Sequence, residues 1–163
     1  MQFKTSSGFT LIEILMVMVI SVTLVGLITV SFLRTKQTTS INNSVNKIIS
    51  DMNSQQLKAM AGSTDGAINS SAYGIYFTQD SYVLFRGSSY SPTDPANISI
   101  SLDQNINISN ISFPGNTIIY SQQSGEISGF NPSSNRLTVN NISANTQRTI
   151  TINRYGVLTS ISQ

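Results

Sequence analysis

The fold depends on one apolar stretch near the N-terminus, residues 9–33, which reads FTLIEILMVMVISVTLVGLITVSFL. The 20 residues from Ile14 to Leu33 carry no charge, and 15 of them are Ile, Leu, Val, Met or Phe. Twenty helical residues at about 1.5 Å each span roughly 30 Å, which is the thickness of the hydrocarbon core of a bilayer. No proline precedes Pro92, so nothing interrupts a helix here. The stretch therefore predicts a membrane-spanning helix.

Three other kinds of segment can contain such an apolar run. The apolar region of a secretory signal peptide is shorter and ends at a small-residue cleavage site, and this stretch has neither feature. A buried helix of a soluble core is rarely apolar on every side. A plain membrane anchor is the strongest alternative, because it needs only the same length and composition.

Glu13 favours a more specific role than anchoring. Its carboxylate interrupts the apolar residues at the head of the run, and a carboxylate in lipid is unfavourable unless it has a partner. The only cationic side chain before it is Lys4, which does not lie at the helical spacing of three or four residues. We expect another molecule to supply the partner. The alternative is that Glu13 marks the interfacial end of the helix.

Residues 4–13, KTSSGFTLIE, resemble the leader and processing site of type IV prepilins and type II secretion pseudopilins. The resemblance covers roughly residues 4–33. It implies that prepilin peptidase removes the leader 1–8 by cutting between Gly8 and Phe9, and that Phe9 becomes an N-methylated terminus. It also implies that Glu13 sets the register of a new subunit against the N-terminal amine of a neighbour.

The same resemblance implies a location and a set of partners. The chain would cross the inner (cytoplasmic) membrane once, with its head outside the cytoplasm, and would later join a surface or periplasmic filament. Its partners would be other pilin or pseudopilin subunits, prepilin peptidase, the inner-membrane assembly platform and the membrane. The flanking charges do not decide the orientation, because Lys4 and the terminal amine on one side balance Arg34 and Lys36 on the other.

The segment 34–62 is predicted to be an amphipathic stem helix. Its apolar residues recur at steps of four and three, which is the spacing of one helix face. Gly62 is a suitable C-terminal cap. A helix continuous from Phe9 to Ala61 would be about 80 Å long. The residues expected on the buried face are Ile41, Val45, Ile48, Ile49, Met52, Gln56, Leu57, Ala59 and Met60.

Residues 63–163 are predicted to form a β-rich globular head, because short β-rich runs alternate with turn residues. We expect one or two antiparallel sheets packed on the stem, which is an α+β, pilin-like fold. A bulge is expected near Asn110, and no second long helix is expected. The expected strands are 73–78, 82–86, 98–102, 106–113, 117–121, 126–130, 137–142, 149–153 and 157–161.

Three stretches of the head resemble the GspH/FimT group of pseudopilins and minor pilins, namely 73–77 with 81–85, 111–115 and 150–157. The resemblance implies a minor subunit of a type IV pilus or type II secretion pseudopilus. A major type IV pilin is the alternative. The chain has no cysteine, whereas major pilins often close a C-terminal loop with a disulfide.

Composition disfavours an enzyme and predicts no cofactor. There is no histidine or cysteine, charged residues are 10% of the chain and the net charge is +2. No metal site is expected, since Asp94 and Asp103 would need backbone carbonyls to hold calcium. Arg136, Arg148 and Arg154 could form a small DNA-binding strip, which leaves a DNA-binding minor pilin as another alternative. The last alternative is a membrane-anchored surface domain that never polymerises.

Overall fold

The computed structural model describes residues 9–66 and 68–162, so the leader 1–8 lies outside the described residues. One helix, α1, runs from Leu11 to Met60, and eight strands and a short 3₁₀ helix, η1 (Pro114–Asn116), follow it. The chain divides within α1 into two compact units, up to Lys36 and from Gln37 onward.

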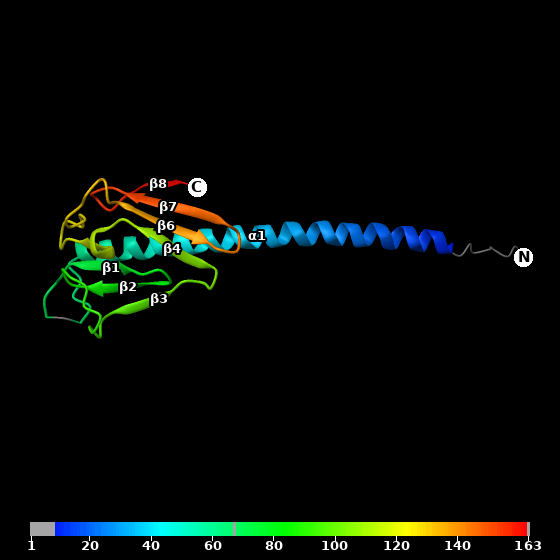
Figure 1. The fold of residues 1–163 in the computed structure, drawn as a ribbon. Helices are drawn as coiled ribbons and strands as arrows, with labels where there is room; N and C mark the ends of the chain where they lie inside the picture. The colour runs from blue at the N-terminus through cyan, green and yellow to red at the C-terminus, as the bar shows by residue number, and fades with distance from the viewer. Residues whose placement is uncertain (1–8, 67, 163) are drawn as a thin grey trace, which may run out of the picture. The chain divides into compact units, whose positions relative to one another are not determined.

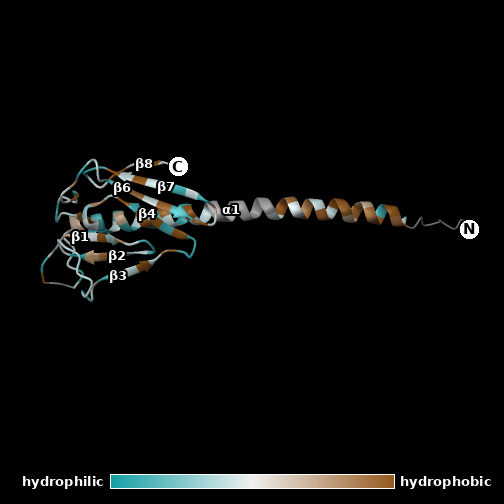
Figure 2. Ribbon diagram, in the orientation of Figure 1, coloured by the Kyte–Doolittle hydropathy of each residue, from teal (hydrophilic) through white to brown (hydrophobic). Residues whose placement is uncertain are grey.

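The described apolar side chains of the first unit lie on the surface of the helix. Every large apolar side chain from Leu11 to Ile28 is more than half exposed. Hydrophobic residues follow one another along this segment in Figure 2, and the mean hydropathy of Leu11–Thr29 is 2.7. Helices of this kind need lipid or other apolar helices around them.

Two threonines inside the apolar segment have their hydroxyl groups satisfied by the helix itself. The Thr23 hydroxyl donates to the carbonyl of Ile20 at 2.8 Å, and the Thr29 hydroxyl donates to the carbonyl of Val25 at 2.8 Å. A hydroxyl bonded in this way needs no water. These polar residues are therefore compatible with a membrane-spanning helix.

The second unit contains two four-stranded antiparallel sheets, which Figure 1 draws below and above the C-terminal part of α1. This arrangement confirms the predicted α+β, pilin-like fold. The first sheet has the order β3-β2-β1-β5, with β1 (Tyr73–Phe77), β2 (Ser81–Arg86), β3 (Ile98–Ser101) and β5 (Thr117–Tyr120). The second has the order β4-β6-β7-β8, with β4 (Ile106–Ile111), β6 (Arg136–Asn141), β7 (Thr146–Ile152) and β8 (Leu158–Ser162).

The core of the head forms where both sheets pack on one face of α1. The helix contributes the predicted residues Ile41, Val45, Ile48, Met52 and Ala59 to a single cluster with strand residues. The side chains on the inner faces of the strands include those of Tyr73, Ile75, Phe77, Tyr82, Ile118, Leu137, Val139, Ile150 and Ile152.

The prediction for the buried helix face was wrong at Leu57 and Met60. Their side chains are 63% and 49% exposed, and the polar Gln55 is buried instead. Steps of three and four residues from Met52 lead to Gln55 and then to Ala59. Burial on this part of the helix therefore follows the helical period, and it does not follow the apolarity of each side chain. The Gln55 amide donates to the carbonyl of Gly74 at 3.3 Å, which partly compensates its burial.

The end of α1 confirms Gly62 as the cap. Gly62 has a φ of +64°, in the left-handed region that favours glycine. The N–H of Gly62 donates to the carbonyl of Ala59, and the N–H of Ser63 donates to that of Lys58. This pair of bonds is the Schellman motif.

The strand predictions hold apart from one segment. The expected bulge is present as a shift of register between Ile108 and Asn110. The segment 126–130 is not a strand, and its only pairing is an isolated bridge from Ile127 to Tyr120. Gly125 and Gly129 on either side of Ile127 have φ values of +66° and +65°, so the chain turns there and cannot stay extended.

Polar contacts fix α1 against the head. The Tyr82 hydroxyl donates to the Asp51 carboxylate at 2.5 Å, and the Gln56 amide donates to the carbonyls of Gly125 and Tyr155 at 2.9 and 2.5 Å. The N–H of Gln123 donates to the carbonyl of Ala59 at 2.9 Å. These bonds join the helix to β2 and to two loops.

Two buried tyrosines are predicted to make the fold sensitive to alkali. Burial, followed by the bond to Asp51, raises the pKa of Tyr82, and burial alone raises the pKa of Tyr120. Both phenols stay neutral in the folded chain, whereas they ionise near pH 10 when unfolded. The free energy of unfolding should therefore fall as the pH rises above about 10, by about 1.4 kcal/mol per pH unit for each tyrosine.

Urea unfolding of the full chain in detergent, followed by far-ultraviolet circular dichroism, would measure this slope. Tyr82→Phe and Tyr120→Phe should each lower the slope of the unfolding free energy by about 1.4 kcal/mol per pH unit. Tyr155→Phe, at a 61% exposed residue, should leave the slope unchanged. At neutral pH Tyr82→Phe should destabilise the fold by about 1–2 kcal/mol, because Asp51 loses its donor. Tyr120→Phe should be neutral or stabilising, because no described group bonds the Tyr120 hydroxyl. Equal slopes in all variants would contradict the prediction.

Candidate functional site

The first turn of α1 contains a reciprocal hydrogen-bond arrangement between Thr10 and Glu13. The backbone N–H and the hydroxyl of Thr10 both donate to Oε2 of Glu13 at 2.8 Å. The N–H of Glu13 donates in return to Oγ1 of Thr10 at 3.3 Å. This is a capping box, with Thr10 at the N-cap and Glu13 three residues later. It explains why the helix begins at Leu11.

Sequence reasoning missed the partner that Glu13 has within its own chain. A cation is only one kind of partner for a carboxylate, and Thr-x-x-Glu before an apolar run is itself a helix-start signal. The negative carboxylate also lies at the positive end of the helix dipole, which is a favourable position. Glu13 therefore has a local structural role, whatever it does between subunits.

The capping box leaves part of the Glu13 carboxylate available. Both bonds go to Oε2, and within residues 9–66 and 68–162 no hydrogen bond reaches Oε1. A carboxylate can accept about four hydrogen bonds, so the group can hold Thr10 and still accept from a second donor. The neighbouring apolar side chains are exposed, which places this acceptor in a surface that must be covered by lipid or protein.

The structure describes two of the three predicted site residues. Phe9 lies two residues before α1 and is 85% exposed, and Glu13 lies in the first turn. Gly8 is outside the described residues.

The acidic residues of the head do not gather into a metal site. An oxygen of Asp94 accepts from the N–H of Ala96, and an oxygen of Asp103 accepts from the hydroxyl of Ser40 at 3.4 Å. Across the described part of the chain, no three potential ligands among His, Cys, Asp and Glu lie together.

The three arginines considered for DNA do not share a surface. Arg136 pairs with Thr151 and Arg148 pairs with Val139, so the two arginines lie on opposite faces of the β6–β7 ladder. Arg154 is paired with Glu126 at 2.9 Å. A strip that follows a phosphate backbone needs several cations along one face.

Comparison with known proteins supports the N-terminal assignment. Residues 3–29 match a family model described as the prokaryotic N-terminal methylation motif. No curated protein sequence and no solved structure matches the chain. The matched segment contains Gly8, Phe9 and Glu13. A motif of this kind indicates a type IV pilin-like or pseudopilin subunit that is processed by prepilin peptidase.

The capping box yields a test on the isolated subunit. Thr10→Val should lower the stability of the first turn by about 1 kcal/mol, because it removes the hydroxyl that donates to Oε2 and accepts from the N–H of Glu13. Hydrogen exchange of the amides of residues 13–16 in detergent micelles should then be about five times faster. Thr10→Ser keeps the hydroxyl and should preserve the slower exchange. Equal exchange in all three proteins would show that the capping box does not stabilise the helix start.

Proposed function

We propose that this chain is a structural subunit of a type IV pilus or a type II secretion pseudopilus. The observation that carries the proposal is the methylation motif over residues 3–29, continued by an apolar helix that is exposed on all sides. In this reading the segment 1–8 is the leader, 9–33 is the membrane-spanning and filament-core helix, 34–62 is the stem and 63–163 is the head. The role is structural and not catalytic.

Processing would create the charge that Glu13 needs. Hydrolysis of the peptide bond between Gly8 and Phe9 by prepilin peptidase releases the leader and leaves an amine on Phe9, which is then methylated. A secondary amine still carries a proton and a positive charge at neutral pH. Gly8 presents no side chain to obstruct a protease at a membrane surface.

Assembly would follow from the attraction between this amine and a carboxylate. In a membrane or filament core the two opposite charges attract strongly, and either one alone is strongly disfavoured. Oε1 of Glu13 in one subunit is the acceptor for the Phe9 amine of a neighbour, while Oε2 keeps the capping box. The bond is satisfied only at one axial position, so it sets the register of the added subunit.

Location and partners are part of the proposal. The subunit waits in the inner membrane as a single-pass protein, with its head outside the cytoplasm, until the assembly platform adds it to a surface or periplasmic filament. The partners are other pilin or pseudopilin subunits, prepilin peptidase and that platform. We favour a minor subunit of the GspH/FimT kind over a major pilin, because the chain has no cysteine to close a disulfide loop.

The processing step is tested by intact mass and N-terminal sequencing of the full chain expressed with and without an active prepilin peptidase. With the peptidase, the chain should begin at Phe9 and carry one extra methyl group. Gly8→Val should retain residues 1–8, because a branched side chain now stands at the cut bond. A wild-type chain that still begins at Met1 beside the active peptidase would overturn the proposal.

The assembly step is tested with Glu13→Gln, which separates the two roles of this residue. Glutamine also serves in a capping box, so the helix start should survive while the charge is lost. The variant should be cleaved normally but should be at least tenfold depleted from sheared filaments of the native host. Thr29→Val, a neutral change within the same apolar segment, should assemble like the wild type. Normal incorporation of Glu13→Gln would remove the register role.

A further inference from the structure

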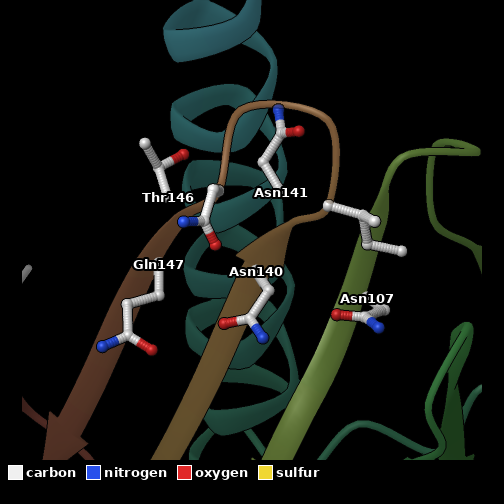
Figure 3. Close-up of a pocket in the computed structure, with 7 residues that line it drawn as sticks. Asn107, Asn140, Asn141, Thr146 and Gln147 are labelled. Atoms are coloured by element: carbon white, nitrogen blue, oxygen red, sulfur yellow. The ribbon is translucent and has the colours of Figure 1, made fainter.

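The outer face of the second sheet contains a polar hollow that the filament role does not use. It has a volume of about 520 Å³ and is lined by Asn107, Asn140, Asn141, Ile142, Thr146 and Gln147, which we call the amide hollow. Asn107 lies opposite Asn140, and Asn140 lies opposite Gln147. Figure 3 shows these three side chains on adjacent strands, where they form a row of amides across β4, β6 and β7.

Two oxygens of this amide row lack a hydrogen bond. Oδ1 of Asn107 and Oδ1 of Asn140 are almost fully covered, and neither has a partner among the described residues. They are two of the seven such side-chain atoms in the described part of the chain. Covered polar atoms without partners are unfavourable, and each needs an explanation. Both belong to side chains of the amide row, whose amide groups give the wall of the hollow donors as well as acceptors.

The wall of the hollow is held in place before any ligand arrives. The N–H of Ile142 donates to the carbonyl of Asn105 at 2.8 Å, and the N–H of Ala144 donates to Oδ1 of Asn141 at 3.0 Å. Asn145, which also lines the hollow, has a φ of +50° that closes the β6–β7 turn. A preorganised wall loses little entropy when it binds.

The chemistry of the wall selects a neutral ligand rich in hydroxyl groups. None of the described residues lining it is charged. An amide both donates and accepts, and so does a hydroxyl group. A phosphate or carboxylate only accepts and would offer no donor to the oxygen acceptors of the wall. A metal cation would satisfy the oxygens, but it leaves the amide N–H₂ groups unused and finds no carboxylate.

We propose that the amide hollow binds a neutral carbohydrate. The volume lies within the range of about 300–1,000 Å³ that small-ligand sites occupy. Ile142 is 64% exposed and provides an apolar contact for the C–H face of a sugar ring. A peptide would instead be bound through a strand edge or through apolar side-chain pockets, and the hollow offers neither. A site with few net hydrogen bonds predicts a dissociation constant on the order of 1 mM.

The test is saturation-transfer NMR on the full chain, solubilised in a detergent without a sugar headgroup. The probes are neutral gluco-, galacto- and manno-configured trisaccharides, a trisaccharide of a uronic acid, a neutral tripeptide and a single-stranded oligonucleotide. At least one neutral trisaccharide should give signal, and the charged probes should not. The variants are Asn140→Leu, which keeps the branched shape of the side chain but removes its donors and acceptor, and Gln147→Ala, whose exposed side chain contributes little to folding.

Each variant should weaken the binding of the trisaccharide at least tenfold. The control is Thr151→Val, which lies on the same strand and the same sheet face as Gln147 but outside the hollow. It should bind like the wild type, and unchanged circular dichroism would show that all variants fold. The proposal is overturned if no neutral trisaccharide binds at 10 mM (about ten times the expected constant). It is also overturned if binding survives both variants, or if only the peptide or the oligonucleotide binds.

Discussion

The rest of the structure depends on the exposed apolar surface of residues 11–29. No part of the described chain covers it, and each side chain there would be unfavourable in water. The same surface can face lipid before assembly and other helices afterwards, because helix side chains and lipid tails are similarly apolar. Exchange between the two environments is therefore nearly neutral in hydrophobic energy. Specificity must come from a polar group, and Glu13 is the acidic residue in this segment.

Glu13 combines two requirements that are usually separate. A lone carboxylate in an apolar region is unfavourable, yet a recognition charge must remain available until a partner arrives. The capping box answers the first requirement, because Thr10 supplies two donors and the helix start supplies a favourable dipole. In the proposed assembly, Oε1 would answer the second. A subunit in the membrane would then hold its carboxylate at the membrane surface before a partner of opposite charge arrives.

Local and periodic features could be predicted from the sequence, and features made by pairing could not. The apolar run, the Gly62 cap and the bulge near Asn110 each follow from a few neighbouring residues. Gln55 was missed because apolarity was followed instead of the helical period. The segment 126–130 was wrongly expected to be a strand, because its flanking glycines were not expected to take positive φ values. The amide hollow was not foreseen, since Asn107 and Gln147 meet only through the register of β4, β6 and β7.

The composition of the head suggests how it can contact other molecules. Ser, Thr and Asn make up about 36% of the chain, and the described ion pairs, Lys58–Asp65 and Arg154–Glu126, are both partly exposed. Such pairs contribute little to stability and are screened by salt. Contacts made by this surface must rely on neutral hydrogen bonds and on shape. Contacts of that kind change little with ionic strength, and the amide hollow offers neutral donors and acceptors for them.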